Sequence, residues 1–316
     1  MYLSTPSQKP TLKSILRKCY RKAQAIFGQI DFVPSGHFYS PIANAKEIEE
    51  GIAHRSYEPS DLVGIDLQLE SQRALLKEFA KFYAELPFAE SKQPHLRYYF
   101  DNPAYCHSDG ICLYAMIRHL RPQRIIEVGS GFSSALMHDV RELFFTGKNL
   151  MGGGGKINSL HITHIEPYPA LLHSLLKQSD IDSHNTHILP HRLQEIDLSI
   201  FEELEANDIL FIDSTHIAKI NSDVNRIFFE ILPRLKRGVY IHFHDIFYPF
   251  SYPNDWLRDK NSWNETYLLR AFLSFNAAFE IVFFNTCLNH LYKDEFAAAL
   301  PLSQKNTGGS LWLRKL

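Results

Sequence analysis

A glycine-rich segment at residues 127–134, Glu-Val-Gly-Ser-Gly-Phe-Ser-Ser, lies between an apolar run and a helical pattern. Glycines let the backbone turn sharply and approach a ligand closely, and the start of a helix presents free N–H groups. The segment therefore indicates a loop that contacts a cofactor. A tight turn without a ligand is the alternative, because a lone G-x-G is weak evidence and Ser134 stands where dinucleotide-binding loops have Gly or Ala.

An acidic residue, Glu166, ends the next expected strand. A carboxylate at this position can bind the ribose diol of a dinucleotide or of a nucleoside cofactor. Glu166 follows Gly131 by more than the usual spacing of about 20 residues. The tetraglycine at 152–155, which we interpret as a surface insertion, accounts for the excess. An exposed glutamate without a ligand is the alternative.

Two further strand ends carry titratable side chains, Asp213 and His216 after one strand and His244 and Asp245 after another. In an open α/β sheet the carboxyl ends of the strands face the ligand crevice, so we expect all these features at one edge. The chain has 16 histidines, and we interpret those at 161, 164, 184 and 187 as incidental.

The segment from residue 109 onward alternates between helical and strand patterns. The expected strands span 124–128, 160–165, 186–189, 209–212 and 239–243, and the expected helices span 110–120, 133–145, 170–178 and 222–235. Such alternation is typical of a parallel sheet with helices on both faces.

The end of the chain breaks this alternation. A helix over 265–275 precedes a bulky apolar strand at 279–284, and a loop then leads to a closing strand at 308–313. Two strands without a crossover helix between them predict an antiparallel pair at one edge of the sheet.

The first 105 residues contain no convincing strand. A basic amphipathic helix is expected over 12–27, an aromatic and proline-containing loop over 31–42, and a second helix over 66–86. We expect two parts: a helical and loop extension at 1–105, and a catalytic domain at 106–316. Within the first part, residues 37–42 and the adjoining segment 105–109 are candidates for a lid or an acceptor wall, with structural loop packing as the alternative.

Composition excludes several classes of protein. The chain has 316 residues, 33 Lys and Arg against 35 Asp and Glu, and 45% hydrophobic residues. This balance argues against nucleic-acid binding, and no window approaches the roughly 18 apolar residues of a membrane span. The four cysteines have no metal or redox spacing, and the N-terminus shows no signal core, so we expect a cytoplasmic protein.

The order of these motifs resembles class I S-adenosylmethionine-dependent methyltransferases, in particular a small-molecule branch with E-V-G-S-G-x-S-S and a late His-Asp. The resemblance covers about residues 105–316 and rests on five segments: 124–134, 165–167, 211–216, 244–245 and 309–314. It implies a Rossmann-like, mostly parallel seven-stranded α/β sheet whose last two strands form an antiparallel pair. Many relatives read Asp-Gly-x-His where this chain has Asp-Ser-Thr-His at 213–216, so we expect a different loop backbone there.

The resemblance also implies which residues bind the cofactor S-adenosylmethionine. The glycine-rich turn would surround the methionine moiety, Glu166 would hold the ribose hydroxyls, Gln194 would contact adenine, and Asp213 would lie beside the methyl-donor end. The full implied set is Glu127, Gly129, Ser130, Gly131, Ser133, Glu166, Gln194 and Asp213.

The methyl acceptor is expected to be an oxygen of a small molecule or of a glycan intermediate. A sulfonium already activates the methyl group, so the protein must align donor and acceptor and exclude water. A base assists when the acceptor is a hydroxyl. His244 is the first choice because histidine titrates near neutral pH, with His216, Asp213 and Asp245 as alternatives.

The same four residues offer oxygen and nitrogen ligands, so a divalent metal held by Asp213, His216, His244 and Asp245 is an open hypothesis, as are purely structural histidines. An NAD(P)-dependent oxidoreductase, a metal-dependent hydrolase built on His242-Phe-His244-Asp245, and a non-catalytic nucleoside-binding scaffold are the alternative functions. The aromatic segment 243–263 is either a substrate wall or a subunit contact of a homo-oligomer.

Overall fold

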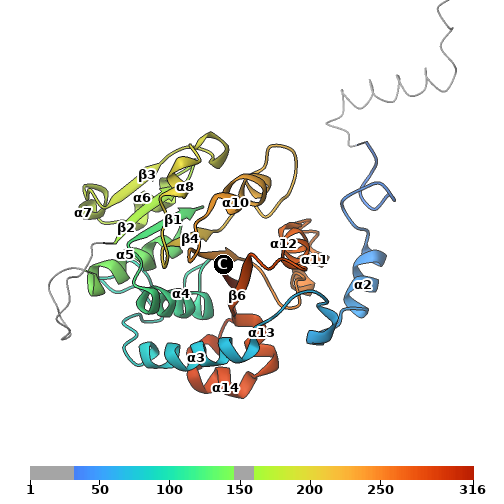
Figure 1. Cartoon of the computed structure of the whole chain (residues 1–316), viewed down its shortest axis with the longest axis horizontal. Helices are drawn as coiled ribbons and strands as arrows, with labels where there is room; N and C mark the ends of the chain where they lie inside the picture. The colour runs from blue at the N-terminus through green and yellow to red at the C-terminus, as the bar shows by residue number, and fades with distance from the viewer. Residues whose placement is uncertain (1–31, 146–159) are drawn as a thin grey trace, which may run out of the picture. The chain divides into compact units, whose positions relative to one another are not determined.

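The central element is a sheet of seven strands in the order β3-β2-β1-β4-β5-β7-β6 (Figure 1). The computed structural model describes residues 32–145 and 160–316. The strands are β1 (Arg124–Val128), β2 (His161–Ile165), β3 (Thr186–Leu189), β4 (Ile209–Ile212), β5 (Tyr240–His244), β6 (Phe279–Phe284) and β7 (Ser310–Lys315).

Strand pairing confirms the predicted fold class. Strands β1 to β5 pair in parallel, whereas β7 runs antiparallel to both of its neighbours, β5 and β6. The central strands β4 and β5 are buried along their whole length. Burial on both faces explains why β4, Ile-Leu-Phe-Ile, is a continuous apolar run in the sequence, whereas β5 also buries His242 and His244.

Along the chain, helices precede, separate and follow the strands. Their bounds are α2 (Ala45–Ala53), α3 (Leu69–Tyr83), α4 (His107–Leu120), α5 (Phe132–Phe144), α6 (Ala170–Leu175), α7 (Gln178–Ile181), α8 (Ser199–Glu202), α9 (Asp223–Arg226), α10 (Leu232–Arg234), α11 (Asn254–Arg258), α12 (Glu265–Leu273), α13 (Asn285–Leu291) and α14 (Lys293–Ala299). Short 3₁₀ turns lie at Pro59–Asp61, Leu193–Glu195 and Pro301–Gln304, and a π-helical turn at Ile227–Ile231 joins α9 to α10. None of the helices within the described ranges has the length and apolar composition needed to cross a membrane.

Two predicted features are wrong in detail. The loop expected between 284 and 308 contains the helices α13 and α14, which bury Leu288 and Phe296 in the core. The helix expected over 170–178 is divided into α6 and α7, because Leu176 is extended with ψ of 150°. The predicted helix at 12–27 and the tetraglycine insertion lie outside the described residues.

Successive side chains along a strand point to opposite faces of the sheet, and each face packs into its own hydrophobic core. Along β1, Ile125 belongs to the core with α4 and α5, whereas Ile126 belongs to the core on the opposite face. Because side chains alternate along a strand, Glu127 points to the same side as Ile125, toward α5. This alternation decides which polar side chains can meet inside the fold.

The described residues divide into a small unit, 32–55 with 254–262, and a large unit, 56–145 with 160–253 and 263–316. Within the small unit, α2 contacts α11, and Arg258 donates a 2.8 Å hydrogen bond to Glu49. Within the large unit, residues of α3 and of the segment 84–106 join the same core as α4. The division into a 1–105 extension and a 106–316 domain stays a prediction.

Candidate functional site at the carboxyl edge of the sheet

The ends of β1 and β4 approach each other closely at Gly129. Gly129 has a φ of 80°, a left-handed conformation that favours glycine, and a Cβ on it would lie 2.0 Å from the carbonyl oxygen of Asp213. The Asp213 N–H donates a 2.9 Å bond to the carbonyl of Val128. The absent side chain therefore lets Asp213 lie directly against the glycine-rich turn.

Glu127 holds this turn together from inside the fold. Its carboxylate is fully buried and accepts hydrogen bonds from the Ser133 and Ser134 hydroxyls and from Nδ1 of His164. The Ser134 hydroxyl in turn accepts a 3.0 Å bond from the Gly131 N–H. The side chain of Glu127 thus points away from the cavity described below, and its role toward the methionine moiety stays a prediction.

Glu166, at the end of β2, lies on the other side of the turn. One carboxylate oxygen accepts a 3.2 Å bond from the Ser130 N–H, and the other accepts a 2.8 Å bond from the Tyr168 N–H. The side chain is half-buried, so lone pairs of both oxygens are open to a ligand hydroxyl.

A cavity of about 470 Å³ opens beside these residues, which is the size of a small-molecule site. Four members of the implied cofactor set line it: Gly129, Glu166, Gln194 and Asp213. The remaining wall includes Val128, Ile165, Pro167, Tyr168, Arg192, Leu193, Ser214, Thr215, Ile217, Lys219, Asn221, Ser222 and Asp223. The structure does not place Glu127, Ser130, Gly131 or Ser133 on this wall.

His244, at the end of β5, is buried among three carboxylates. Its Nδ1 lies 3.5 Å from Asp213 Oδ1 and 3.8 Å from Asp245 Oδ1, and its Nε2 lies 3.6 Å from Asp109 Oδ2. Neither ring nitrogen has a hydrogen-bond partner within the described residues. Electrostatic attraction to the three carboxylates, rather than short hydrogen bonds, therefore stabilises the imidazole.

His216 joins the same cluster from the loop after β4. Its Nδ1 lies 2.8 Å from Glu265 Oε2, and its Nε2 lies 3.5 Å from Asp213 Oδ1 and 3.6 Å from Asp245 Oδ2. His216 and Asp245 both have left-handed backbones, with φ of 59° and 57°. Such conformations are uncommon in residues other than glycine and gather at functional sites.

The carboxylates set the charge of both imidazoles. Burial lowers the pKa of His216, but Asp213 and Glu265 outweigh it and raise the value to about 10. Burial likewise opposes the charge of His244, yet Asp213 and Asp245 raise its pKa well above the ordinary value. Both histidines are therefore imidazolium ions near neutral pH. The expectation that His244 titrates near neutrality does not agree with this environment.

The two aspartates between the histidines differ in basicity. Burial acts to raise the pKa of Asp213, but His244 and His216 hold it well below its usual range. For Asp245 burial prevails over the same two histidines, and the pKa is raised. Asp245 is thus the stronger base of the pair.

Sequence reasoning missed the contacts of three residues, Asp109, Glu265 and His164, and it included Asp109 only within the 105–109 candidate for a lid or an acceptor wall. Asp109, on α4, faces His244 and also accepts bonds from the Ser310 hydroxyl and the Gly309 N–H. Glu265, at the start of α12, is almost fully buried against His216. His164, interpreted as incidental, bonds Glu127. The register that aligns His164 with Glu127 across β1 and β2 is the signal that could have indicated this contact.

The candidate acceptor-wall segments differ in placement. Tyr105 is fully buried, and its ring centre lies 5.0 Å from that of His244. Its hydroxyl has no hydrogen-bond partner among the described residues. The 105–109 segment therefore packs against the histidine cluster. In the small unit, Phe38 and Tyr39 of the 37–42 segment are exposed.

Metal binding gains no support from this geometry. Within residues 32–145 and 160–316, no group of three or more His, Cys, Asp or Glu side chains is arranged to hold a metal ion. The four residues suggested as ligands form the ion pairs described above.

Comparison with known proteins identifies the domain. Residues 126–246 match a family model described as a methyltransferase domain. A protein of Archaeoglobus fulgidus described as uncharacterized is 35% identical over 181 residues, which are 56% of this chain and 75% of that protein. Among solved structures, a Podospora anserina methyltransferase with bound S-adenosylhomocysteine is similar over 91% of this chain and 100% of that chain, with 12% identity and a TM-score of 0.42. The [4+2]-cyclase SpnF is similar over 79% of this chain and 95% of that chain, with 14% identity and a TM-score of 0.33.

Gly129→Ala tests the close approach of β1 and β4. We expect it to lower the free energy of unfolding by about 1–3 kcal/mol, because alanine is strained at this φ and its Cβ meets the Asp213 carbonyl. Urea denaturation measures the change. Gly131→Ala is the matched control, since φ is 178° there and the nearest atom to an added Cβ lies 3.8 Å away. Equal effects of the two substitutions would contradict the contact.

The raised pKa of His216 predicts a pH-dependent contribution to stability. Because the folded-state value of about 10 exceeds the ordinary 6.5, this contribution is complete below about pH 6.5 and is lost as pH rises toward 10. The difference in unfolding free energy between the wild type and His216→Gln should therefore shrink between pH 6.5 and 9.5. Urea denaturation at several pH values measures it, and a difference that grows with pH would be inconsistent with the ion pairs.

Proposed function

We propose that this chain methylates an oxygen of a small molecule or of a glycan intermediate. It belongs to the same family as the Archaeoglobus fulgidus protein and is an S-adenosylmethionine-dependent methyltransferase. The observation that carries the proposal is the shared position of Asp213. This residue lines the cavity at the carboxyl edge and also lies between His216 and His244. The cavity for the cofactor therefore lies next to the side chains that can bind or release a proton.

The cavity fits a nucleoside cofactor with a cationic end. Glu166 has carboxylate lone pairs open to the ribose hydroxyls, and Gln194 lies on the same wall for the adenine. Asp213, with just over a third of its side chain exposed, offers a carboxylate to a positive group. When bound, S-adenosylmethionine supplies a methyl group already activated by a sulfonium.

The acceptor proton requires a base, and we assign this role to Asp245 rather than to His244. A hydroxyl must lose its proton as its oxygen receives the methyl group, and a placed base contributes about 10²- to 10⁴-fold. His244 and His216 already carry protons near neutral pH, and Asp213 is a weaker base because two imidazolium ions face it. Asp245 combines the raised pKa of a buried carboxyl with a side chain that is 17% exposed.

The family match leaves the nicotinamide-dependent and hydrolytic alternatives without support. The described cysteines Cys106, Cys112 and Cys287 are free thiols, which agrees with the cytoplasmic location that we propose.

Glu166→Ala tests the ribose contact. We expect the Kd for S-adenosylhomocysteine to rise about tenfold or more, because a ligand hydroxyl loses a charged acceptor. Isothermal titration calorimetry measures the Kd. Glu203→Ala, at an exposed glutamate of the large unit that does not line this cavity, should leave it unchanged. An unchanged Kd in Glu166→Ala would remove Glu166 from the site.

Asp245→Asn tests the base. With an acceptor selected from a panel of hydroxylated small molecules and sugars, we expect kcat to fall about 10²- to 10⁴-fold. The wild-type rate should decline as pH falls, because the carboxylate must be unprotonated, and the midpoint should lie above that of an ordinary aspartate. Labelled methyl transfer across a pH series gives both results. A limb near neutral pH that disappears in His244→Asn would assign the base to His244 instead.

A further inference from the structure

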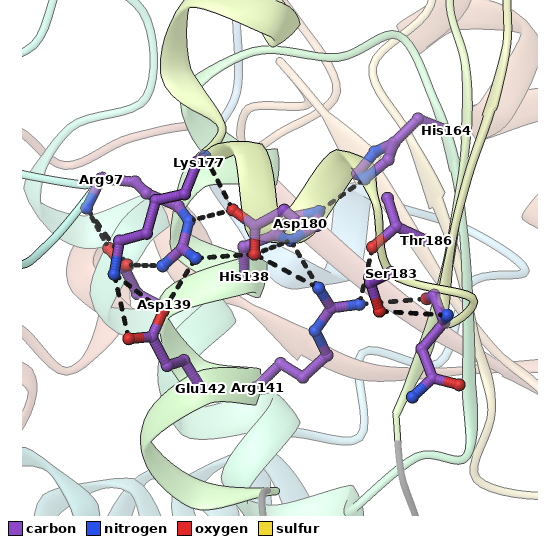
Figure 2. Close-up of polar contacts among 11 residues, drawn as sticks. Arg97, His138, Asp139, Arg141, Glu142, His164, Lys177, Asp180, Ser183 and Thr186 are labelled. Carbon is purple, nitrogen blue, oxygen red and sulfur yellow. Dashed lines mark hydrogen bonds and ion pairs between the residues drawn. The ribbon is translucent and has the colours of Figure 1, made fainter.

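A chain of hydrogen-bonded side chains extends from the glycine-rich turn into the fold, away from the cavity. It contains Glu127, His164, His138 and Arg141, and we call it the relay. The His164 Nδ1 lies 2.5 Å from Glu127, the Nε2 atoms of His164 and His138 lie 2.9 Å apart, and His138 Nδ1 lies 3.0 Å from Arg141 Nη2. Figure 2 shows its inner part, from His164 to Arg141. Glu127 and both imidazoles are fully buried.

The end groups fix the direction of every bond in the relay. A carboxylate only accepts, so Nδ1 of His164 must carry a proton, and a guanidinium only donates, so Nδ1 of His138 must accept. Between the two rings, His138 Nε2–H is then the donor and His164 Nε2 the acceptor. One arrangement of neutral imidazoles therefore satisfies all three bonds and connects the cation of Arg141 to the carboxylate of Glu127.

The surroundings agree with a neutral His138. Burial lowers its pKa to about 3 and outweighs Asp180, with the Arg141 cation lowering it further. Asp180 Oδ1 is 3.4 Å from His138 Nδ1, farther than Arg141, and it is already bonded by Arg97 at 2.7 Å. Nδ1 of His138 thus takes its hydrogen bond from Arg141.

The far end of the relay is anchored to two other elements. Arg141 donates to the Asn185 carbonyl at 3.0 Å and to the Thr186 hydroxyl, at the start of β3, at 2.9 Å. Asp180, on α7, is held by Arg97, which also bonds Asp139 on α5 (Figure 2). The Arg141 guanidinium therefore has a fixed position from which the relay can orient Glu127.

At the end that contains Glu127, the relay is hydrogen-bonded to the glycine-rich turn. Glu127 accepts from Ser133 and Ser134, and Ser134 accepts from the Gly131 N–H. On α5, Ser134 and His138 are four residues apart and so face the same side. A carboxylate buried without compensation is costly, and a polarised chain of hydrogen bonds supplies that compensation.

We propose that the relay sets the geometry of the glycine-rich turn for cofactor binding, and that His164 and His138 are positioning residues for methyl transfer. This inference rests on the proposed function, because it takes the turn to be part of the cofactor site. A turn held in shape before binding loses less freedom when the ligand arrives. Breaking the relay should therefore weaken cofactor binding although no relay histidine lines the cavity.

Two substitutions at His138 separate a missing hydrogen bond from a missing ring. His138→Phe keeps a ring but has no donor, and we expect the Kd for S-adenosylhomocysteine to rise about tenfold. His138→Gln restores an N–H donor toward His164, and its Kd should stay within about threefold of the wild type. His187→Gln, at an exposed histidine of β3, is the control. Calorimetric titration gives the Kd values, and the KM for S-adenosylmethionine should change more than kcat.

Nitrogen-15 NMR of labelled histidines tests the relay in the wild type, independently of any variant that fails to fold. We expect a neutral His164 with the proton on Nδ1 and a neutral His138 with the proton on Nε2. A doubly protonated His164, or one protonated on Nε2, would overturn the relay. A wild type that does not bind S-adenosylhomocysteine would refute the proposed function instead. A binding wild type with an unchanged Kd in folded His138→Phe would refute this inference alone.

Discussion

The site depends on the contact between Gly129 and the backbone of Asp213. Because no Cβ separates them, the loop after β4 lies against the turn after β1. Asp213 can then line the cavity and also face two histidines that come from different strand ends. A larger residue at position 129 would displace Asp213, and the cavity would lose its connection to the cluster of carboxylates and histidines.

Charge distribution gives the edge of the sheet its chemical character. Four carboxylates, those of Asp109, Asp213, Asp245 and Glu265, face the two imidazoles of His216 and His244. Even with both imidazoles protonated, the cluster keeps a negative charge, which complements a cationic methyl donor. The same excess of carboxylates makes the histidines poor bases near neutral pH, which is why we propose an aspartate as the base.

Much of the fold could be predicted because buried parallel strands are short apolar runs. The bounds of β1, β3, β4 and β6 agree with the expected ranges, and β5 differs by one residue at each end. Helices α13 and α14 were missed because each is a single short amphipathic segment whose apolar side meets the core only in the folded chain. Half of the implied cofactor set lines the cavity, since strand ends meet at one edge whatever the loop sequences are.

The electrostatics of the site could not be predicted, because they depend on residues distant in sequence. Asp109 and Glu265 come from helices α4 and α12, and neither lies near His244 or His216 along the chain. Together with Asp213 and Asp245, their carboxylates raise the pKa values of both histidines and reverse the expectation drawn from an isolated histidine. The contact of His164 with Glu127 likewise depends on the register between β1 and β2, which alternation alone does not specify.

A crystal structure of the complex with S-adenosylhomocysteine would show whether the cofactor binds at the carboxyl edge of the sheet. We expect the ribose hydroxyls to contact Glu166, the adenine to lie near Gln194, and the sulfur to lie beside Asp213. A ligand bound away from the edge formed by β1, β2 and β4, or one bound with Glu166 and Asp213 both facing solvent, would contradict this expectation.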